Sequence, residues 1–318
     1  MSNKVYVTRE IPKIGLDILS KYFEVEVNKK DRPLTKDELI SKIKGKDAVL
    51  TQLTDQIDKE VIEKANTVKI FANYAVGYNN IDIEFAKKRD IIVTNTPEVL
   101  SDTTAELAWA LLFAVSRRVV EGDNYVRKGK WKQFSPKLLL GQDINNKTLG
   151  IIGAGRIGKA FAKKSIGYDM EILYHNRSRD MEFEKVYNAK WVDMDTLLNR
   201  SDFISLHVPL TDATYHLIGK KELNNMKDTA ILINTSRGAV IDEEALVKAL
   251  ENEVIWGAGL DVFENEPVVH NKLLDMDNVV LLPHIGSAST ETRDKMAKIA
   301  AKNIVQVLKG KDPISQVK

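Results

Sequence analysis

The feature that most constrains this 318-residue sequence is a glycine-rich turn, preceded by an apolar run and followed by a helical pattern. In "TLGIIGAGRIGKAFAKKSIG" the glycines are Gly153, Gly155 and Gly158. The first permits a tight turn, the second lets the backbone approach a pyrophosphate, and the third lets the helix pack on the strand. Because free N–H groups at a helix N-terminus bind phosphate, this arrangement predicts a dinucleotide site in a βαβ unit.

Strand-like and helix-like segments alternate along the whole chain. Four runs are predicted strands before residue 100, namely "KVYV", "DAVLTQL", "VKIFANYAV" and "IIVTNTP". Six more follow, namely "KTLGIIG", "EILYH", "DFISLHV", "AILINTS", "GAGLDVF" and "NVVLLPH". Alternation of this kind predicts mostly parallel sheets with helices on both faces.

Two segments carry the spacing of a helix capping box, in which an N-terminal hydroxyl and a later acid cap the helix reciprocally. Thr35 and Glu38 have it in "TKDELISKI". Thr103 and Glu106 have it in "SDTTAELAWALLFAVSRRVV", which we interpret as one long apolar helix. A last helix is predicted in "STETRDKMAKIAAKNIVQVLKG", with no strand after it.

Composition limits the classes of function. The length is sufficient for two domains. Lys+Arg 47 against Asp+Glu 45 gives a formal net charge of +2, which indicates no nucleic-acid or anionic-membrane partner. The sequence has no cysteine, which excludes disulfides, cysteine nucleophiles and thiolate metal sites, and we predict no metal site. Since no apolar run has the length of a signal peptide or a membrane span, we expect a cytoplasmic protein.

Three polar residues follow predicted strands, where open α/β sheets bind ligands. Arg237 follows "AILINTS", Glu266 follows "GAGLDVF" and His284 follows "NVVLL". An arginine can bind a carboxylate, a histidine titrates near neutrality, and a glutamate beside it favours the imidazolium. Together they could hold a 2-oxo acid and supply the proton that accompanies hydride transfer, although singly Arg237 could be a loop residue and Glu266 a surface acid. His207 in "LHVPL" either borders the cofactor or is a packed strand histidine.

The second predicted strand of the dinucleotide domain lacks the acid that usually binds a ribose diol. In "EILYHNRSRD", His175 occupies about that place, and Asn176, Arg177 and Ser178 follow. A cation flanked by neutral hydrogen-bonding groups suits a 2′-phosphate, so NADP is favoured over NAD. The alternative is that Arg177 and Arg179 are ordinary surface charges of a turn.

The sequence resembles the D-isomer-specific 2-hydroxyacid dehydrogenases over essentially its whole length, most of all the glyoxylate/hydroxypyruvate reductase branch. The resemblance rests on seven motifs in order, "NYAVGYNNID", "NTPEVLSDTTAELAWAL", "GIIGAGRIG", "LHVPLT", "LINTSRGAVIDEEAL", "GLDVFENEP" and "LLPHIGSAS". It implies two doubly wound α/β domains: a Rossmann dinucleotide-binding domain, residues 100–286, inserted into a flavodoxin-like substrate domain, residues 1–99 plus 287–318. It also implies a homodimer with the long helix after Ser101 at the interface.

The resemblance further implies roles for individual residues. Arg237, Glu266 and His284 are the expected catalytic residues, and Arg237 and His284 also contact the substrate. The backbone N–H groups of Val76 and Gly77 are expected to bind the substrate carboxylate, with Leu53 nearby. The residues expected to border the cofactor are Gly153, Ala154, Gly155, Arg156, Ile157, Gly158, Asn176, Arg177, Ser178, His207, Thr235, Ser236, Asp261, Ile285 and Gly286. Asn79 stands where the family usually has aspartate, which we interpret as a local difference in the loop.

The implied activity is the NAD(P)H-dependent reduction of a small 2-oxo acid, such as glyoxylate, hydroxypyruvate or 2-ketogluconate, to the D-2-hydroxy acid. Two alternatives stay open at this point. Other D-2-hydroxyacid dehydrogenases, of the D-lactate, phosphoglycerate or formate type, share the same frame. A dinucleotide-sensing binding protein, such as the corepressor relatives of these enzymes, retains much of the same site.

Overall fold

The structure, a computed structural model, describes residues 2–317, which form two compact units. The first unit comprises residues up to 100 and from 287 onward, and the second comprises residues 101–286. The second unit is therefore inserted into the chain of the first. Each unit is a parallel sheet covered by helices, which confirms the predicted fold class.

The sheet of the first unit has five parallel strands in the order β2-β1-β3-β4-β5. Their bounds are β1 (Lys4–Val7), β2 (Glu24–Val27), β3 (Ala48–Thr51), β4 (Ile70–Asn73) and β5 (Ile92–Thr94). This is the flavodoxin-like order. Strand β2 is missing from the sequence prediction because "EVEV" is a half-buried edge strand without the continuous apolar run of β3 and β4.

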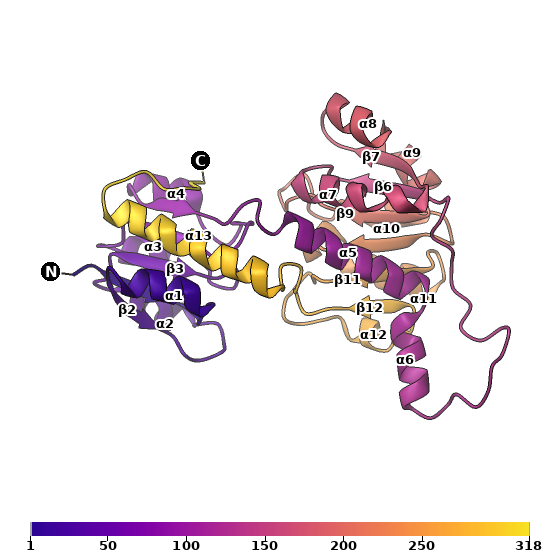
Figure 1. The fold of residues 1–318 in the computed structure, drawn as a ribbon, viewed down its shortest axis with the longest axis horizontal. Coiled ribbons are helices and arrows are strands. Elements are labelled where there is room, and N and C mark those ends of the chain that lie inside the picture. The colour runs from indigo at the N-terminus through magenta and orange to yellow at the C-terminus, as the bar shows by residue number, and fades with distance from the viewer. Residues whose placement is uncertain (1, 318) are drawn as a thin grey trace. The chain divides into compact units, whose positions relative to one another are not determined.

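The helices of the first unit are α1 (Lys13–Ser20), α2 (Lys36–Ile43), α3 (Lys59–Lys64), α4 (Ile83–Lys88) and α13 (Thr290–Leu308). The predicted capping box of α2 is confirmed, since Thr35 Oγ1 accepts the Glu38 N–H and Glu38 Oε2 accepts the Thr35 N–H. Figure 1 shows α13 lying along α1, although the two helices come from opposite ends of the chain. The two helices pack closely at Gly15 of α1. A Cβ there would lie only 2.9 Å from the Ala297 Cβ of α13, so a larger residue would force the helices apart.

The sheet of the second unit has seven parallel strands in the order β12-β11-β10-β9-β6-β7-β8. Their bounds are β6 (Thr148–Ile152), β7 (Glu171–His175), β8 (Lys190–Trp191), β9 (Phe203–Leu206), β10 (Ile231–Asn234), β11 (Gly257–Leu260) and β12 (Val279–Leu281). Counted from β6, this is the dinucleotide-binding order 3-2-1-4-5-6 with one further strand, β12, at the edge. The sequence prediction missed β8, since its two residues are both exposed.

The helices of the second unit are α5 (Ser101–Ser116), α6 (Val119–Arg127), α7 (Arg156–Lys164), α8 (Met181–Tyr187), α9 (Met194–Arg200), α10 (Lys220–Asn224), α11 (Glu243–Glu251) and α12 (Asn271–Leu274). Helices α5 and α7 pack together, and α5 also contacts β10, β11 and β12. In the described part of the chain no helix combines the length and the hydrophobicity that a bilayer span requires.

The long apolar helix predicted over residues 101–120 is confirmed as α5 over Ser101–Ser116, but the prediction of one continuous helix is wrong in its last four residues. Arg118 adopts a left-handed conformation with φ 51°, which ends α5 and turns the chain into α6. The predicted capping box at Thr103 is also wrong, because α5 begins at Ser101 and Thr103 lies inside its first turn. The earlier start places Asp102 in the first turn, where the helix dipole favours an acid.

Candidate active site

The glycine turn joins β6 to α7, and its three glycines have different surroundings. Gly153 has φ +95°, and a Cβ there would lie 2.8 Å from the carbonyl carbon of His207. A Cβ on Gly158 would overlap the carbonyl oxygen of Gly153, so the helix approaches the strand as closely as the backbone allows. A Cβ on Gly155 would meet nothing within 4 Å. The backbone at Gly155 therefore faces open space.

The N-terminus of α7 fits an anionic phosphate. No side chain caps this helix, whose first turn begins with Arg156 and Ile157. The first N–H groups of a helix have no acceptor within it, and the helix dipole attracts negative charge to them. The Ala154 N–H just before the helix instead donates to Asn176 Oδ1 at 2.7 Å, which ties the end of β7 to the turn. The donors at this point suit a pyrophosphate.

The two arginines after β7 differ in their surroundings. Arg179 is held by Glu184 through two hydrogen bonds, Nε to Oε1 and Nη2 to Oε2, of 2.7 Å each. Arg177 and Ser178 are exposed, and within residues 2–317 no hydrogen bond or ion pair engages the Arg177 guanidinium. Arg177 is thus the cation that is available to a ligand at this strand end.

His284 and Glu266 form a hydrogen-bonded pair. His284 lies three residues beyond β12, and its Nδ1 is 2.7 Å from Glu266 Oε2. Glu266 Oε1 accepts the N–H of Phe263 at 3.1 Å, so both carboxylate oxygens are engaged. Burial alone raises the pKa of Glu266, but the hydrogen bond and charge of His284, the Phe263 N–H and the charge of Arg237 together hold that pKa below its usual value. The pair is therefore an ionised carboxylate against an imidazole ring.

Asp261 holds the turn that carries His284. It follows β11 directly and is 1% exposed. Its two carboxylate oxygens accept the N–H groups of Ile285 and Gly286, at 2.7 Å each. Burial raises the pKa of Asp261, while the two N–H bonds and the positive charge of His284 oppose that shift. The bonds support a backbone in which His284 has φ +56°, a conformation that a side chain with a Cβ disfavours.

Arg237 is presented by a compact turn after β10. Asn234, the last residue of β10, accepts the Ser236 N–H at 3.0 Å and donates to the Arg237 carbonyl at 2.9 Å. Burial lowers the pKa of the Arg237 guanidinium, and the charge of Glu266 opposes this. A Cβ on Gly238 would overlap the carbonyl group of Phe263, so only glycine lets this turn lie against the segment that leads to Glu266.

Two further polar residues lie after strands of this sheet. Thr235 Oγ1 is buried and has no hydrogen-bond partner among the described residues, which leaves it for a ligand. His207 packs its ring on Phe161, with centroids 5.2 Å apart, and its Nε2 lies 2.9 Å from Ser205 Oγ. Burial lowers the pKa of His207 to about 3, so its imidazole is neutral at physiological pH.

The structure gathers the residues predicted for catalysis and cofactor binding at the carboxyl ends of β6, β7, β9, β10, β11 and β12. In the first unit, Leu53 follows β3, and Val76 and Gly77 follow β4. The two loops are joined by the buried Asn80, whose Nδ2 donates to the Gln52 carbonyl at 3.1 Å. Among the described residues, no group of histidine, aspartate or glutamate is arranged to hold a metal ion.

Sequence reasoning missed the asparagines that shape these loops. Asn234 ends β10, Asn73 ends β4, and Asn95 directly follows β5. Their shared signal is an apolar strand run that closes on asparagine, in "ILIN", "IFAN" and "IVTN". A buried amide at a strand end can satisfy both a carbonyl and an N–H of the loop that follows.

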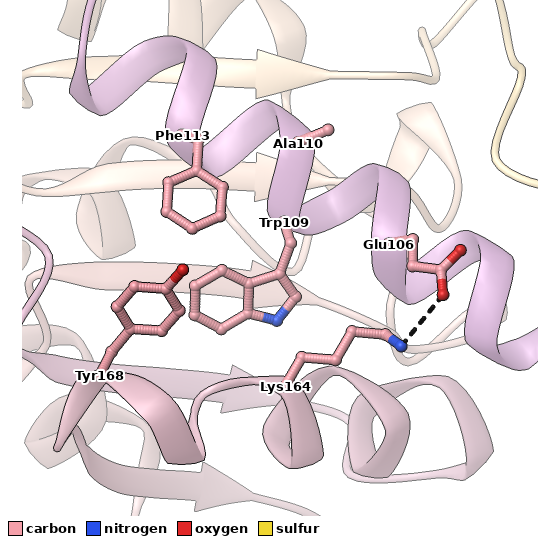
Figure 2. A pocket seen from close by; sticks show the side chains of 6 residues that line it. All are labelled: Glu106, Trp109, Ala110, Phe113, Lys164 and Tyr168. Carbon is pink, nitrogen blue, oxygen red and sulfur yellow. Dashed lines mark hydrogen bonds and ion pairs between the residues drawn. The ribbon is translucent and has the colours of Figure 1, made fainter.

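A separate hollow lies on α5 and the end of α7. Figure 2 shows Trp109 and Phe113 of α5 facing Tyr168, with Lys164 reaching Glu106. The Trp109 and Tyr168 rings are stacked at 5.5 Å, and Lys164 Nζ lies 3.3 Å from Glu106 Oε1. Since Lys164 is the last residue of α7, the hollow is at the opposite end of that helix from the glycine turn.

Comparisons with known proteins show which family the chain and its fold resemble. Residues 109–286 match the family model described as the D-isomer specific 2-hydroxyacid dehydrogenase, NAD binding domain. The chain is 53% identical over 317 residues to the glyoxylate reductase of Thermococcus litoralis, covering 98% of this chain and 96% of the relative. It superposes on a crystal structure of a Thermus thermophilus protein with a TM-score of 0.94, at 43% identity over 99% of this chain and 100% of that one. A crystal structure of the NADPH-dependent glyoxylate/hydroxypyruvate reductase of Sinorhizobium meliloti, in complex with NADP and malonate, gives a TM-score of 0.88 at 29% identity, covering 100% and 97% of the two chains.

Proposed function

Since this chain belongs to the D-isomer-specific 2-hydroxyacid dehydrogenases, in the glyoxylate reductase branch, we propose that it reduces glyoxylate to glycolate, or hydroxypyruvate to D-glycerate, with a nicotinamide cofactor. The observation that carries the proposal is the His284–Glu266 pair, in which Nδ1 lies 2.7 Å from Oε2. The pair and Arg237 all follow the carboxyl ends of strands in the same sheet. A 2-oxo acid needs a cation for its polar groups and a proton for its carbonyl oxygen. These three side chains provide both.

The roles follow from the contacts of each side chain. The reduced nicotinamide, when bound, supplies the hydride that adds to C2 of the oxo acid. His284 has its Nδ1 engaged by Glu266, so its Nε2 is the atom that donates a proton to the developing alkoxide. Glu266 keeps the ring oriented and compensates the positive charge of the imidazolium. Arg237, with its backbone fixed by Asn234, binds the 2-oxo acid and polarises its carbonyl.

We assign dinucleotide binding to the second unit and carboxylate binding to the first. The glycine turn and the uncapped start of α7 support the former for the pyrophosphate, and the unpartnered Thr235 hydroxyl supports it for the nicotinamide end. In the first unit, the N–H groups of Val76 and Gly77 make no hydrogen bond within residues 2–317. They are the donors we assign to the substrate carboxylate.

We propose NADP as the preferred cofactor. The support is the unengaged guanidinium of Arg177 beside Ser178 at the end of β7, in a strand end that carries no acid. Arginine binds phosphate through several N–H donors and suits a 2′-phosphate better than a ribose diol. The Sinorhizobium meliloti relative, described as NADPH-dependent, is consistent with this preference.

Initial rates on a panel of oxo acids test the activity and the cofactor together. The panel comprises glyoxylate, hydroxypyruvate, 2-ketogluconate, pyruvate and 3-phosphohydroxypyruvate, each with NADPH and with NADH. We expect the highest kcat/KM for glyoxylate or hydroxypyruvate with NADPH. Preference for pyruvate or the phosphorylated acid would reassign the enzyme within its family. Tight NADPH binding without turnover of any acid would support a dinucleotide-sensing protein.

We also propose that the protein is a homodimer. Its interface would cover the apolar surface of α5, α6 and the segment after α6. Helix α6 buries none of its residues, and Figure 1 shows it extending away from the sheet of its own unit. The segment after it exposes Trp131, Phe134 and Leu140, with Phe134 81% exposed. Apolar surface of this extent commonly marks an association site. Light scattering that gave one chain per particle at micromolar concentration would refute the dimer.

A further inference from the structure

The loop after β4 presents consecutive N–H groups that have no acceptor. Within residues 2–317, the N–H groups of Val76, Gly77 and Tyr78 make no hydrogen bond. Val76 and Gly77 are half-buried and Tyr78 is exposed. N–H groups in such a run are available to an anion.

The carbonyl groups of the same peptides are all fixed. The Thr96 N–H donates to the Ala75 carbonyl, Asn95 Nδ2 donates to the Val76 carbonyl, and Asn73 Nδ2 donates to the Gly77 carbonyl, each at 2.8 Å. In a trans peptide the C=O and the next N–H point in opposite directions within one plane. Fixing the Val76 carbonyl therefore fixes the direction of the Gly77 N–H, and points that N–H away from Asn95.

The asparagines that hold the carbonyls are themselves held. Asn73 is 1% exposed, and its Oδ1 lies 3.2 Å from the Thr51 Oγ1, which donates to it. The Asn95 N–H donates to the Ser315 carbonyl at 3.3 Å, and Ser315 Oγ donates to the Asn95 carbonyl at 2.7 Å. Ser315 is in turn held by Asn303 of α13. The C-terminal segment thus fixes the backbone from which the Asn95 amide reaches Val76.

We propose that Asn95 is a positioning residue for the reaction: through the Val76 carbonyl it aims the Gly77 N–H at the substrate carboxylate. Asn73 does the same, through the Gly77 carbonyl, for the Tyr78 N–H, which adds a donor that the family resemblance does not include. The inference rests on the proposed function, because it takes the anion to be the carboxylate of the 2-oxo acid. Neither asparagine touches the substrate.

The test replaces Asn95 by the isosteric aspartate, which cannot donate to the Val76 carbonyl and would repel it. We expect the Asn95→Asp variant to raise the KM for glyoxylate at least tenfold, since the Gly77 N–H, no longer held in direction, loses its hydrogen bond to the charged substrate carboxylate. The inhibition constant of oxamate should rise in parallel. The kcat at saturating glyoxylate should stay within about threefold of wild type, and the KM for NADPH should not change, because no group on the second unit is altered.

Asn28→Asp is the matched control. Asn28 follows β2 and donates from Nδ2 to the Thr8 carbonyl at 3.0 Å, so the same substitution removes a similar bond in the same unit. Its KM for glyoxylate should equal that of wild type. Equal KM values for Asn95→Asp and wild type would overturn the inference and leave the proposed function intact. A wild-type enzyme that reduces no 2-oxo acid would overturn the proposed function instead.

A measurement on the wild type keeps the inference testable if Asn95→Asp does not fold. With ¹⁵N labelling, saturating oxamate should shift the amide resonances of Val76, Gly77 and Tyr78, while the amide of Gly45, on the turn before β3, stays in place. A Gly77 amide that does not respond to oxamate would refute the proposal.

Discussion

Replacing Asp261 by asparagine separates the activity of the enzyme from its stability. Each oxygen of Asp261 accepts a different N–H, from Ile285 and from Gly286. An amide has only one oxygen, so the Asp261→Asn variant loses one of these bonds and places an NH₂ group against a donor. The turn then keeps His284 at φ +56° with one hydrogen bond from residue 261 in place of two.

The size of the effect follows from these contacts. A hydrogen bond to a charged group contributes about 1.5–3 kcal/mol, and a residue in a sparsely populated conformation costs on the order of 1–3 kcal/mol. The lost bond is therefore comparable to the cost of keeping His284 in its left-handed conformation. At about 1.36 kcal/mol for each factor of ten, we expect kcat/KM for glyoxylate to fall roughly 10- to 100-fold.

The thermal stability of the Asp261→Asn variant should rise or stay unchanged. The pKa of Asp261 is raised by burial, so ionising it costs free energy in the folded state, and that cost grows as pH rises through its folded pKa. The neutral asparagine removes the cost. We expect the melting temperature of Asp261→Asn at pH 7 to equal or exceed that of wild type, while activity falls.

Asp202→Asn is the control, because Asp202 also accepts a backbone N–H, from Thr148 at 2.8 Å, but at the amino ends of β6 and β9. This variant should lose its ion pair with Lys227, and with it a few degrees of melting temperature, and should keep wild-type kcat/KM. If Asp261→Asn stays within twofold of wild type in kcat/KM, the turn does not depend on Asp261 and the reasoning fails.

Three other predictions concern side chains of the second unit. His284→Ala should lower kcat at least 100-fold, the lower limit of general acid catalysis, with the dissociation constant of NADPH unchanged in fluorescence titration; near-wild-type turnover would remove His284 from the mechanism. Arg177→Ala should raise the KM for NADPH much more than that for NADH, and equal effects on both would contradict a 2′-phosphate contact. His207 has a folded pKa of about 3 against an ordinary 6.5, so its contribution to stability is present above pH 6.5 and is lost as pH falls toward 3. Denaturant titrations should show this loss, up to about 5 kcal/mol, and His207→Asn should reduce it.

Features that depend on local spacing could be predicted from the sequence. The glycine turn is one, because the turn, the phosphate approach and the helix packing all lie within six residues. The strands with continuous apolar runs are another. Elements whose burial depends on distant partners could not be predicted. Strand β8 pairs with β7 through two exposed residues, and α5 ends where Arg118 turns left-handed, a conformation that the sequence around it does not indicate.

The same division holds within the candidate site. Residue type and position at a strand end were sufficient to select Arg237, Glu266 and His284, since each lies shortly after its strand. The supporting contacts are different in kind. Asn95 meets the Val76 carbonyl across 19 positions of the chain, and Asp261 meets Gly286 across 25. Such partners are set by strand order, which fixes the loops that lie side by side.

The charges of these supporting residues can be explained by the groups that their loops hold. The loop that we assign to the substrate carboxylate is held by Asn73, Asn80 and Asn95, all neutral amides. An aspartate in any of these places would repel the anion as well as the carbonyl it faces, and a lysine would compete with the N–H groups for the carboxylate. The turn around His284 is held instead by a carboxylate, Asp261, and the charge of His284 opposes the rise in the pKa of that carboxyl that burial causes. The charge of each supporting residue thus matches the charge that its loop has to hold, neutral beside the anion and negative beside the cation.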